Sequence, residues 1–98
     1  MIANLENVGI WGRRRYEYLM KTRPSLIGVL RMTGELSSYL QGVNEEAEEL
    51  FFQTVKETAK REGITEQLKA RDLLAWTGAM NNIAGRAREI VMSEVICV

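Results

Sequence analysis

Apolar side chains recur every three or four residues along most of the chain, and this spacing predicts amphipathic helices. The most regular row lies near the end of the chain, with steps of four, three, four, three and four residues. Its members are Trp76, Met80, Ile83, Ala87, Ile90 and Glu94. No stretch alternates apolar and polar residues for long enough to predict a strand. We therefore expect an all-α fold with a long C-terminal helix over Leu73–Ile96 as its spine.

Glycine, proline and capping residues divide the rest of the chain into shorter helices. Pro24 separates the first two, because the residue before a proline avoids helical geometry and proline suits a first turn. Glycines at 34, 42 and 63 are expected to end helices, and Asn44, Thr65 and Asp72 to cap the next ones. The predicted helices are Val8–Lys21, Pro24–Met32, Glu35–Gln41, a helix from Asn44 to about Glu62, Glu66–Ala70 and Leu73–Ile96.

These elements predict one domain of about five helices over residues 8–98, preceded by a flexible segment at residues 1–7. The long C-terminal helix is expected to pack antiparallel to the helix over residues 44–62. The basic N-terminal helix is expected to lie across this pair.

The C-terminal helix also carries features of a helix–helix interface. Its apolar row is long for the partners that so small a chain supplies, so we expect a homodimer. The expected packing residues are Trp76, Met80, Asn81, Ile83, Ala87 and Ile90. Gly78 and Gly85 each cost about 1 kcal/mol relative to alanine, which close approach of a neighbouring helix would offset. Asn81 and Asn82 leave two alternatives open, a buried amide that fixes helix register or two exposed amides.

Composition excludes several classes of site. The chain has no His and a single Cys, Cys97, which excludes His-based acid–base catalysis, an internal disulfide and a Cys-based zinc site. It contains no glycine-rich phosphate loop and no nucleophile motif. We therefore expect a non-catalytic protein without a cofactor, metal or small-molecule substrate. No apolar run is long enough to span a bilayer, so we expect a cytoplasmic protein without a membrane partner.

Charge is balanced overall but not along the chain. Lys plus Arg and Asp plus Glu each number 13, yet residues 1–34 carry a net charge of +4 and residues 35–55 one of −5. The candidate nucleic-acid contacts in the basic third are Arg13, Arg14, Arg15, Lys21 and Arg23. Such a run can follow a phosphate backbone, with Trp11 or Tyr16 stacking on a base. A solvated face, or pairing with the glutamates, is the alternative.

Two further motifs have structural explanations beside functional ones. Residues 26–43 resemble a helix-turn-helix in outline, but the second helix offers no base to meet a phosphate. Four glutamates follow Asn44 and could bind a hard cation or a partner protein. They are Glu45, Glu46, Glu48 and Glu49. Favourable charge at a helix N-terminus is the structural explanation for this cluster.

The chain resembles a known family through a set of unusual residues in a fixed order. These are Gly63-Ile64-Thr65-Glu66-Gln67-Leu68-Lys69-Ala70, Asp72, Trp76, Gly78, Met80-Asn81-Asn82-Ile83, Arg86-Ala87, Glu89-Ile90 and Glu94. Earlier residues agree, among them Gly9-Ile10, Tyr18-Leu19, Arg23-Pro24 and Tyr39-Leu40. Over about residues 8–97 the chain resembles the transposon-encoded TnpV family. It departs from the family at Ala79 and Ala84, where members tend to carry Arg, and at Arg88, where they carry an acid.

The resemblance implies a small accessory protein of bacterial transposons and integrative elements, without catalytic or binding residues to transfer. Accessory proteins of such elements commonly assist a recombinase or regulate genes of the element. We therefore expect a non-catalytic protein that binds DNA or the recombinase through the basic residues. A protein-interaction or scaffolding module without DNA binding is the alternative.

Overall fold

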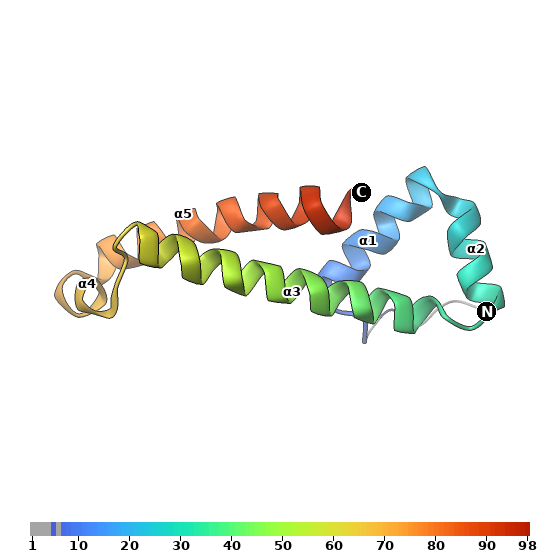
Figure 1. The fold of residues 1–98 in the computed structure, drawn as a ribbon, viewed down its shortest axis with the longest axis horizontal. Helices are drawn as coiled ribbons and strands as arrows, with labels where there is room; N and C mark the ends of the chain where they lie inside the picture. The colour runs from blue at the N-terminus through green and yellow to red at the C-terminus, as the bar shows by residue number, and fades with distance from the viewer. Residues whose placement is uncertain (1–4, 6) are drawn as a thin grey trace.

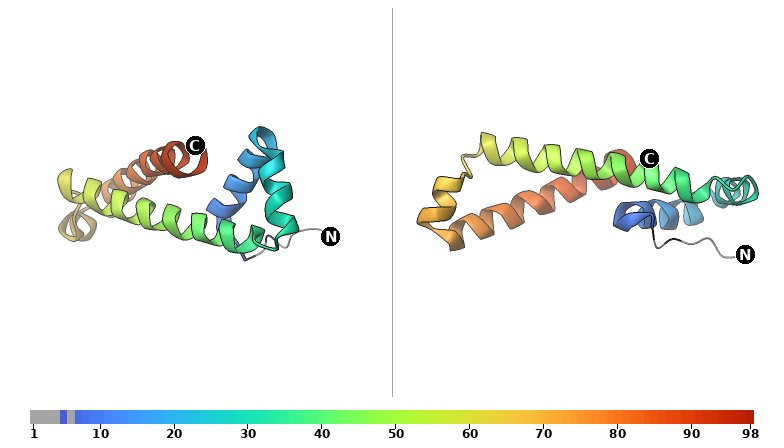
Figure 2. Two further views of the ribbon diagram at one scale, coloured as in Figure 1. Left: turned by 45° about the vertical axis from the view of Figure 1, so that its right-hand side comes forward. Right: turned by 90° about the horizontal axis from the view of Figure 1, so that it is seen from below.

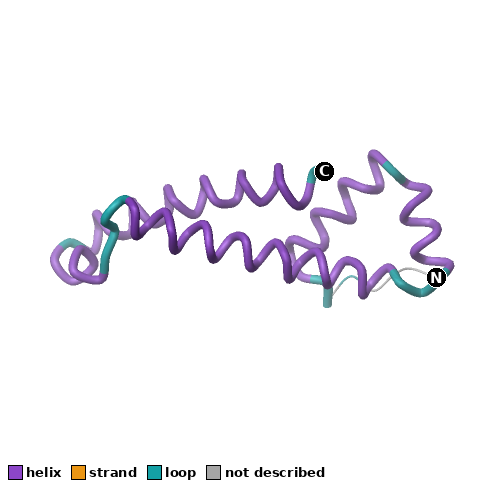
Figure 3. Tube along the Cα trace, viewed as in Figure 1, coloured by secondary structure: helices purple, strands orange, loops and turns teal. Residues whose placement is uncertain are grey.

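The computed structural model describes Leu5 and residues 7–98, and every regular element in them is helical (Figures 1 and 3). The elements are α1 (Gly9–Thr22), α2 (Pro24–Met32), α3 (Leu36–Arg61), α4 (Glu66–Arg71), α5 (Leu73–Val91) and the π-helical turn η1 (Met92–Ile96). The predicted all-α fold is confirmed. Of the predicted flexible segment at residues 1–7, residues 1–4 and 6 lie outside the described residues.

The molecule is elongated around α3, a rod about 39 Å long at 1.5 Å per residue. Helix α5 runs back from α4 beside α3. At the end of the molecule away from α4, α1 contacts both α3 and η1 (Figure 1). The two long helices diverge toward α4 (Figure 2). The molecule measures 55 × 22 × 17 Å along its principal axes. Its radius of gyration is 17.0 Å, whereas a radius of gyration of about 13 Å is expected for a compact chain of this length.

The predicted break in α3 is wrong. The helix continues through Gly42 and Asn44 without interruption, so the predicted helices at residues 35–41 and 44–62 are one element. One interior glycine costs a helix about 1 kcal/mol. The continuous helix places Leu36, Leu40 and Ala47 on one buried face, and burial of these side chains outweighs that cost.

The other predicted helix boundaries agree with the structure to within a residue, except that the last α-helix ends at Val91 and continues to Ile96 as the π-helical turn η1. Pro24 occupies the first turn of α2, and Gly34 and Gly63 follow helix ends with φ of +74° and +72°. The Thr65 hydroxyl accepts from the N–H of Leu68 at 3.3 Å, and the Asp72 carboxylate accepts from the N–H of Ala75 at 3.1 Å. Both predicted N-caps are therefore confirmed.

The core consists of two small clusters at the end of the molecule that α1 covers. One contains Val8, Leu19, Ile27, Leu36 and Leu40. The other contains Trp11, Ala47, Val91 and Ile96. Toward α4 the core narrows to Ala59, Ile83 and Ala87, and α4 itself has no buried residue. Leu73 and Leu74, at the start of α5, are exposed.

The predicted row on α5 agrees with the structure up to Ala87 and then differs. Ile83 and Ala87 are buried, and Trp76 and Met80 are half-buried. The next buried residues are Val91 and Ile96, not Ile90 and Glu94, and Asn81 and Asn82 are exposed. Ile96 follows Val91 by five residues, and the π-turn between them places both side chains in the core. The row packs against other helices of the same chain, so its buried residues are not free to form a dimer interface. The homodimer stays a prediction.

The predicted close approach at Gly78 and Gly85 does not occur within the chain, because a Cβ at either position would meet none of the described atoms within 4 Å. Close approach occurs at α1 instead. A Cβ on Gly12 would lie 2.9 Å from the main-chain oxygen of Leu40. A Cβ on Gly9, which has a φ of +78°, would clash with the Asn44 amide.

Candidate functional site

Asn44 fixes the start of α1 against α3. Its amide oxygen accepts from the main-chain N–H groups of Trp11, at 3.1 Å, and Gly12, at 3.3 Å. Its amide nitrogen donates to the Glu48 carboxylate at 3.1 Å. The side chain of Val8, the N-cap residue of α1, makes no capping hydrogen bond. Asn44 therefore satisfies N–H groups at a helix start, as its residue type predicts, but the helix is not its own.

Arg15 is a buried structural residue. Its side chain is 7% exposed, and its guanidinium donates to the Tyr39 hydroxyl at 3.2 Å and to the main-chain oxygens of Ile96 and Val98 at 2.8 and 2.9 Å. These bonds join α1 to η1. Arg15 is therefore not on the surface where it was predicted to contact a nucleic acid.

The other predicted bases are accessible on α1 and just beyond it. Arg13 and Lys21 are exposed, and Arg14 is half-buried with its guanidinium carbon 4.8 Å from the centre of the Trp11 ring. Arg23 is exposed and donates to the main-chain oxygen of Val98 at 3.1 Å. Among the described residues, none of these four bases pairs with a side-chain carboxylate. We call Arg13, Arg14 and Lys21 the basic face of α1.

The aromatic rings that were predicted beside these bases are not free to stack on a nucleotide. Trp11 is 6% exposed, and one face of its ring is covered by Arg14. Tyr16 is half-buried and accepts a hydrogen bond from Arg31, whose guanidinium also lies over its ring. The basic face therefore offers positive charge without an open aromatic surface.

The helix-turn-helix outline is present as α2, a turn at Thr33-Gly34 and the start of α3. The exposed residues there are Glu35, Ser38 and Gln41, which carry no positive charge. The start of α3 therefore lacks the bases of a DNA-reading helix.

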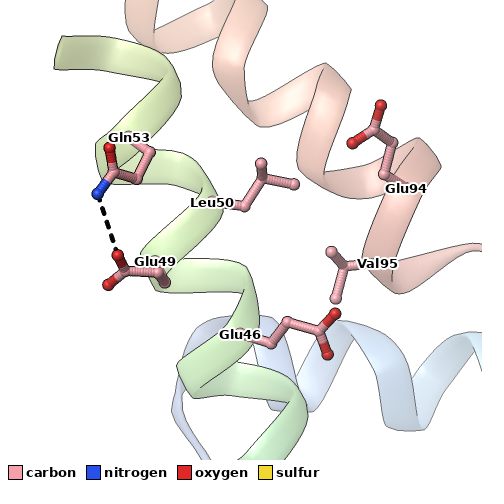
Figure 4. Close-up of a pocket in the computed structure, with 6 residues that line it drawn as sticks. All are labelled: Glu46, Glu49, Leu50, Gln53, Glu94 and Val95. Atoms are coloured by element: carbon pink, nitrogen blue, oxygen red, sulfur yellow. Dashed lines mark hydrogen bonds between the residues drawn. The ribbon is translucent and has the colours of Figure 1, made fainter. Parts of the chain in front are cut away.

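A groove with an acidic rim lies where α3 meets η1 (Figure 4). Glu46 and Glu49 come from α3 and Glu94 from η1, and Leu50 and Val95 form the apolar floor. Glu49 accepts from the Gln53 amide at 3.1 Å. We call these residues the acidic groove.

The helix-dipole explanation for the glutamates is wrong. Because α3 begins at Leu36, residues 45–49 lie in the middle of the helix and not in its first turn. That Glu94 lines the same groove as Glu46 could not be found from the sequence, since it depends on how η1 packs against α3. In the described part of the chain, no group of three or more acidic or Cys side chains could hold a metal ion.

Glu62 and Arg86 form the one ion pair between described side chains, and it joins the end of α3 to α5. The two guanidinium nitrogens of Arg86 donate to the two carboxylate oxygens at 2.8 and 2.7 Å. These hydrogen bonds lower the pKa of Glu62 below its usual value and raise the pKa of Arg86. The pair is exposed and contacts neither the basic face nor the acidic groove, so it is a structural contact.

Comparisons with known proteins show the family to which this chain belongs. Within the described residues, no helix is long and apolar enough to cross a membrane. No curated protein and no solved structure matches the chain. The family model described as transposon-encoded protein TnpV matches residues 2–96, which is nearly the whole sequence. The chain belongs to the transposon-encoded TnpV family.

Proposed function

We propose that this protein is a non-catalytic, cytoplasmic accessory protein of its transposon that binds DNA through the basic face of α1 and so assists or directs the recombinase. The observation that carries the proposal is that Arg13, Arg14 and Lys21 lie within about 100° of one another around the axis of α1, on the side away from the buried Arg15 and Leu19. All three side chains keep their charge free of carboxylate partners within the described residues. Bases that lie along one helix face can contact successive phosphates.

The proposed contact is electrostatic and weak. The chain has no net charge, so no long-range field attracts it to DNA, and three bases can contact about three phosphates. The logarithm of the affinity should therefore fall with the logarithm of salt concentration with a slope of about −3. Binding that does not depend on base sequence fits a face without an open aromatic ring or a base-reading helix.

The test is fluorescence anisotropy with a labelled DNA duplex at low salt. Parent protein should bind in the micromolar range. The Arg13→Ala/Arg14→Ala variant should bind at least tenfold more weakly and show a smaller salt slope. Arg15 stays unchanged, because its loss would alter the fold and not the surface.

The matched control is Lys60→Ala/Arg61→Ala, which removes the same charge from exposed positions at the far end of α3. It should bind DNA within about twofold of the parent. Equal loss in both variants would show a general charge effect, and no binding by the parent at low salt would overturn the proposal.

A further inference from the structure

The acidic groove combines an apolar floor with uncompensated negative charge. Leu50 and Val95 pack against the cluster of Trp11, Ala47, Val91 and Ile96 and remain partly accessible at the bottom of the groove. Figure 4 shows Glu46 reaching from α3 toward Val95, and Glu94 lying beside η1 on the other side of Val95.

The charge in the groove has no partner in the described part of the chain. Glu62 and Arg86 form the one ion pair there, and neither residue lines the groove. Glu49 is hydrogen bonded to a neutral amide, which leaves its charge in place. Glu46 and Glu94 lie beside the apolar floor and Glu49 lies toward Gln53 (Figure 4), so the groove favours a ligand that is cationic at its edges and apolar at its centre.

From this complementarity we infer that the acidic groove binds an amphipathic helix of a partner protein, with Arg or Lys on both sides of an apolar row. A helix satisfies its own main-chain hydrogen bonds, and the described residues contain no strand whose edge could pair with an extended peptide. The apolar row of the partner helix would lie on Leu50 and Val95, and the bases of that helix would reach Glu46 and Glu94.

Other occupants fit the groove less well. DNA would bring phosphates against three carboxylates. A second copy of this chain, offering its own α1, is the other occupant of matching charge, and self-association of the parent in light scattering would show it and overturn the inference.

The elongated chain exposes more surface than a compact protein of its size. The accessible surface is 6704 Å², about 1000 Å² more than the roughly 5700 Å² typical of a compact protein of this size. One partner in a stable protein complex commonly buries about 800 Å².

The test uses the full chain and a synthetic 18-residue helical probe, with Leu along one face, Arg on both flanks and Ala elsewhere. A second probe carries Glu in place of Arg. We expect the Arg probe to bind the parent in fluorescence anisotropy, and the Glu probe to bind at least tenfold more weakly. Glu46→Gln/Glu94→Gln, at two exposed positions, should weaken binding of the Arg probe at least tenfold.

The control variant Glu45→Gln/Glu66→Gln removes the same charge outside the groove and should bind the Arg probe within about twofold of the parent. Arg13→Ala/Arg14→Ala should also bind the probe normally, which separates this proposal from DNA binding. Equal affinity of the groove variant and the parent, equal affinity for both probes, or no binding at 1 mM probe would each overturn the inference.

Discussion

Arg13, Arg14 and Arg15 follow one another in α1, yet each side chain lies in a different environment. Successive residues turn by about 100° around a helix, so three neighbours face three directions. Arg15 lies four residues from both Trp11 and Leu19, which are buried, and this spacing places it on the core side of α1. The spacing of Arg15 from Trp11 and Leu19 is visible in the sequence. A run of three arginines suggests one shared role, however, and draws attention away from this spacing.

Arg15→Ala should destabilise the protein by roughly 2–4 kcal/mol, because it removes the donor to the buried main-chain oxygen of Ile96 and the bonds to Tyr39 and Val98. Urea unfolding followed by circular dichroism measures the change. Arg13→Ala is the matched control and should stay within about 0.5 kcal/mol of the parent, since that side chain is exposed. Equal effects of the two variants would contradict the structural role of Arg15.

At the scale of elements, local signals predict helix ends well where the capping residue lies next to the helix that it caps. Pro24, Thr65 and Asp72 act within a few residues of their own position, and each does what its chemistry predicts. Gly42 and Asn44 lie inside α3, because burial of one continuous face outweighs the local preference. The Asn44 amide caps α1, and a contact across more than thirty residues has no local signal.

The helix glycines divide into two kinds, and substitution distinguishes them. Gly78→Ala and Gly85→Ala should each stabilise the protein by up to about 1 kcal/mol, because both positions face open space. Gly12→Ala should destabilise it, since the added methyl group would press on the main-chain oxygen of Leu40. Thermal unfolding of the three variants provides the measurement. Destabilisation by both Gly78→Ala and Gly85→Ala would show that α5 is covered in solution.

Over the whole molecule, the class of fold and the antiparallel pair of long helices follow from sequence periodicity, whereas the elongated shape does not. Periodicity reports which residues of a helix are buried, but not how far two helices diverge. The candidate sites follow the same rule. A basic helix face could be predicted from charge, whereas the acidic groove requires Glu46 and Glu94, which are 48 positions apart, to line one groove from two helices.

The two ends of the molecule should respond differently to acid. The pKa of Glu62 is lowered in the folded protein, so its contribution to stability is complete above the unfolded value of about 4.3. That contribution is lost as the pH falls through the lower folded pKa. Acid should therefore loosen the α4 end, where burial is sparse and Arg86 binds this carboxylate.

Hydrogen exchange compared at pH 7 and pH 3, expressed as protection factors, measures this response. Protection in α4 and at the end of α3 should fall, while protection around Asn44 should change less. Glu62→Gln at pH 7 should reproduce the loss in α4 without a change of pH. Unchanged protection in this variant would show that the ion pair does not restrain that end.

The five-residue step from Val91 to Ile96 means that the end of the chain contains one residue more than a regular helix needs. Loss of a codon inside a helix normally rotates everything after it away from the core. Here the loss of Ser93 would restore ordinary helical spacing and return the same isoleucine to the same apolar neighbours. The main cost would be a new position for Glu94, so drift in the length of this gene could reshape the acidic groove while leaving the core filled.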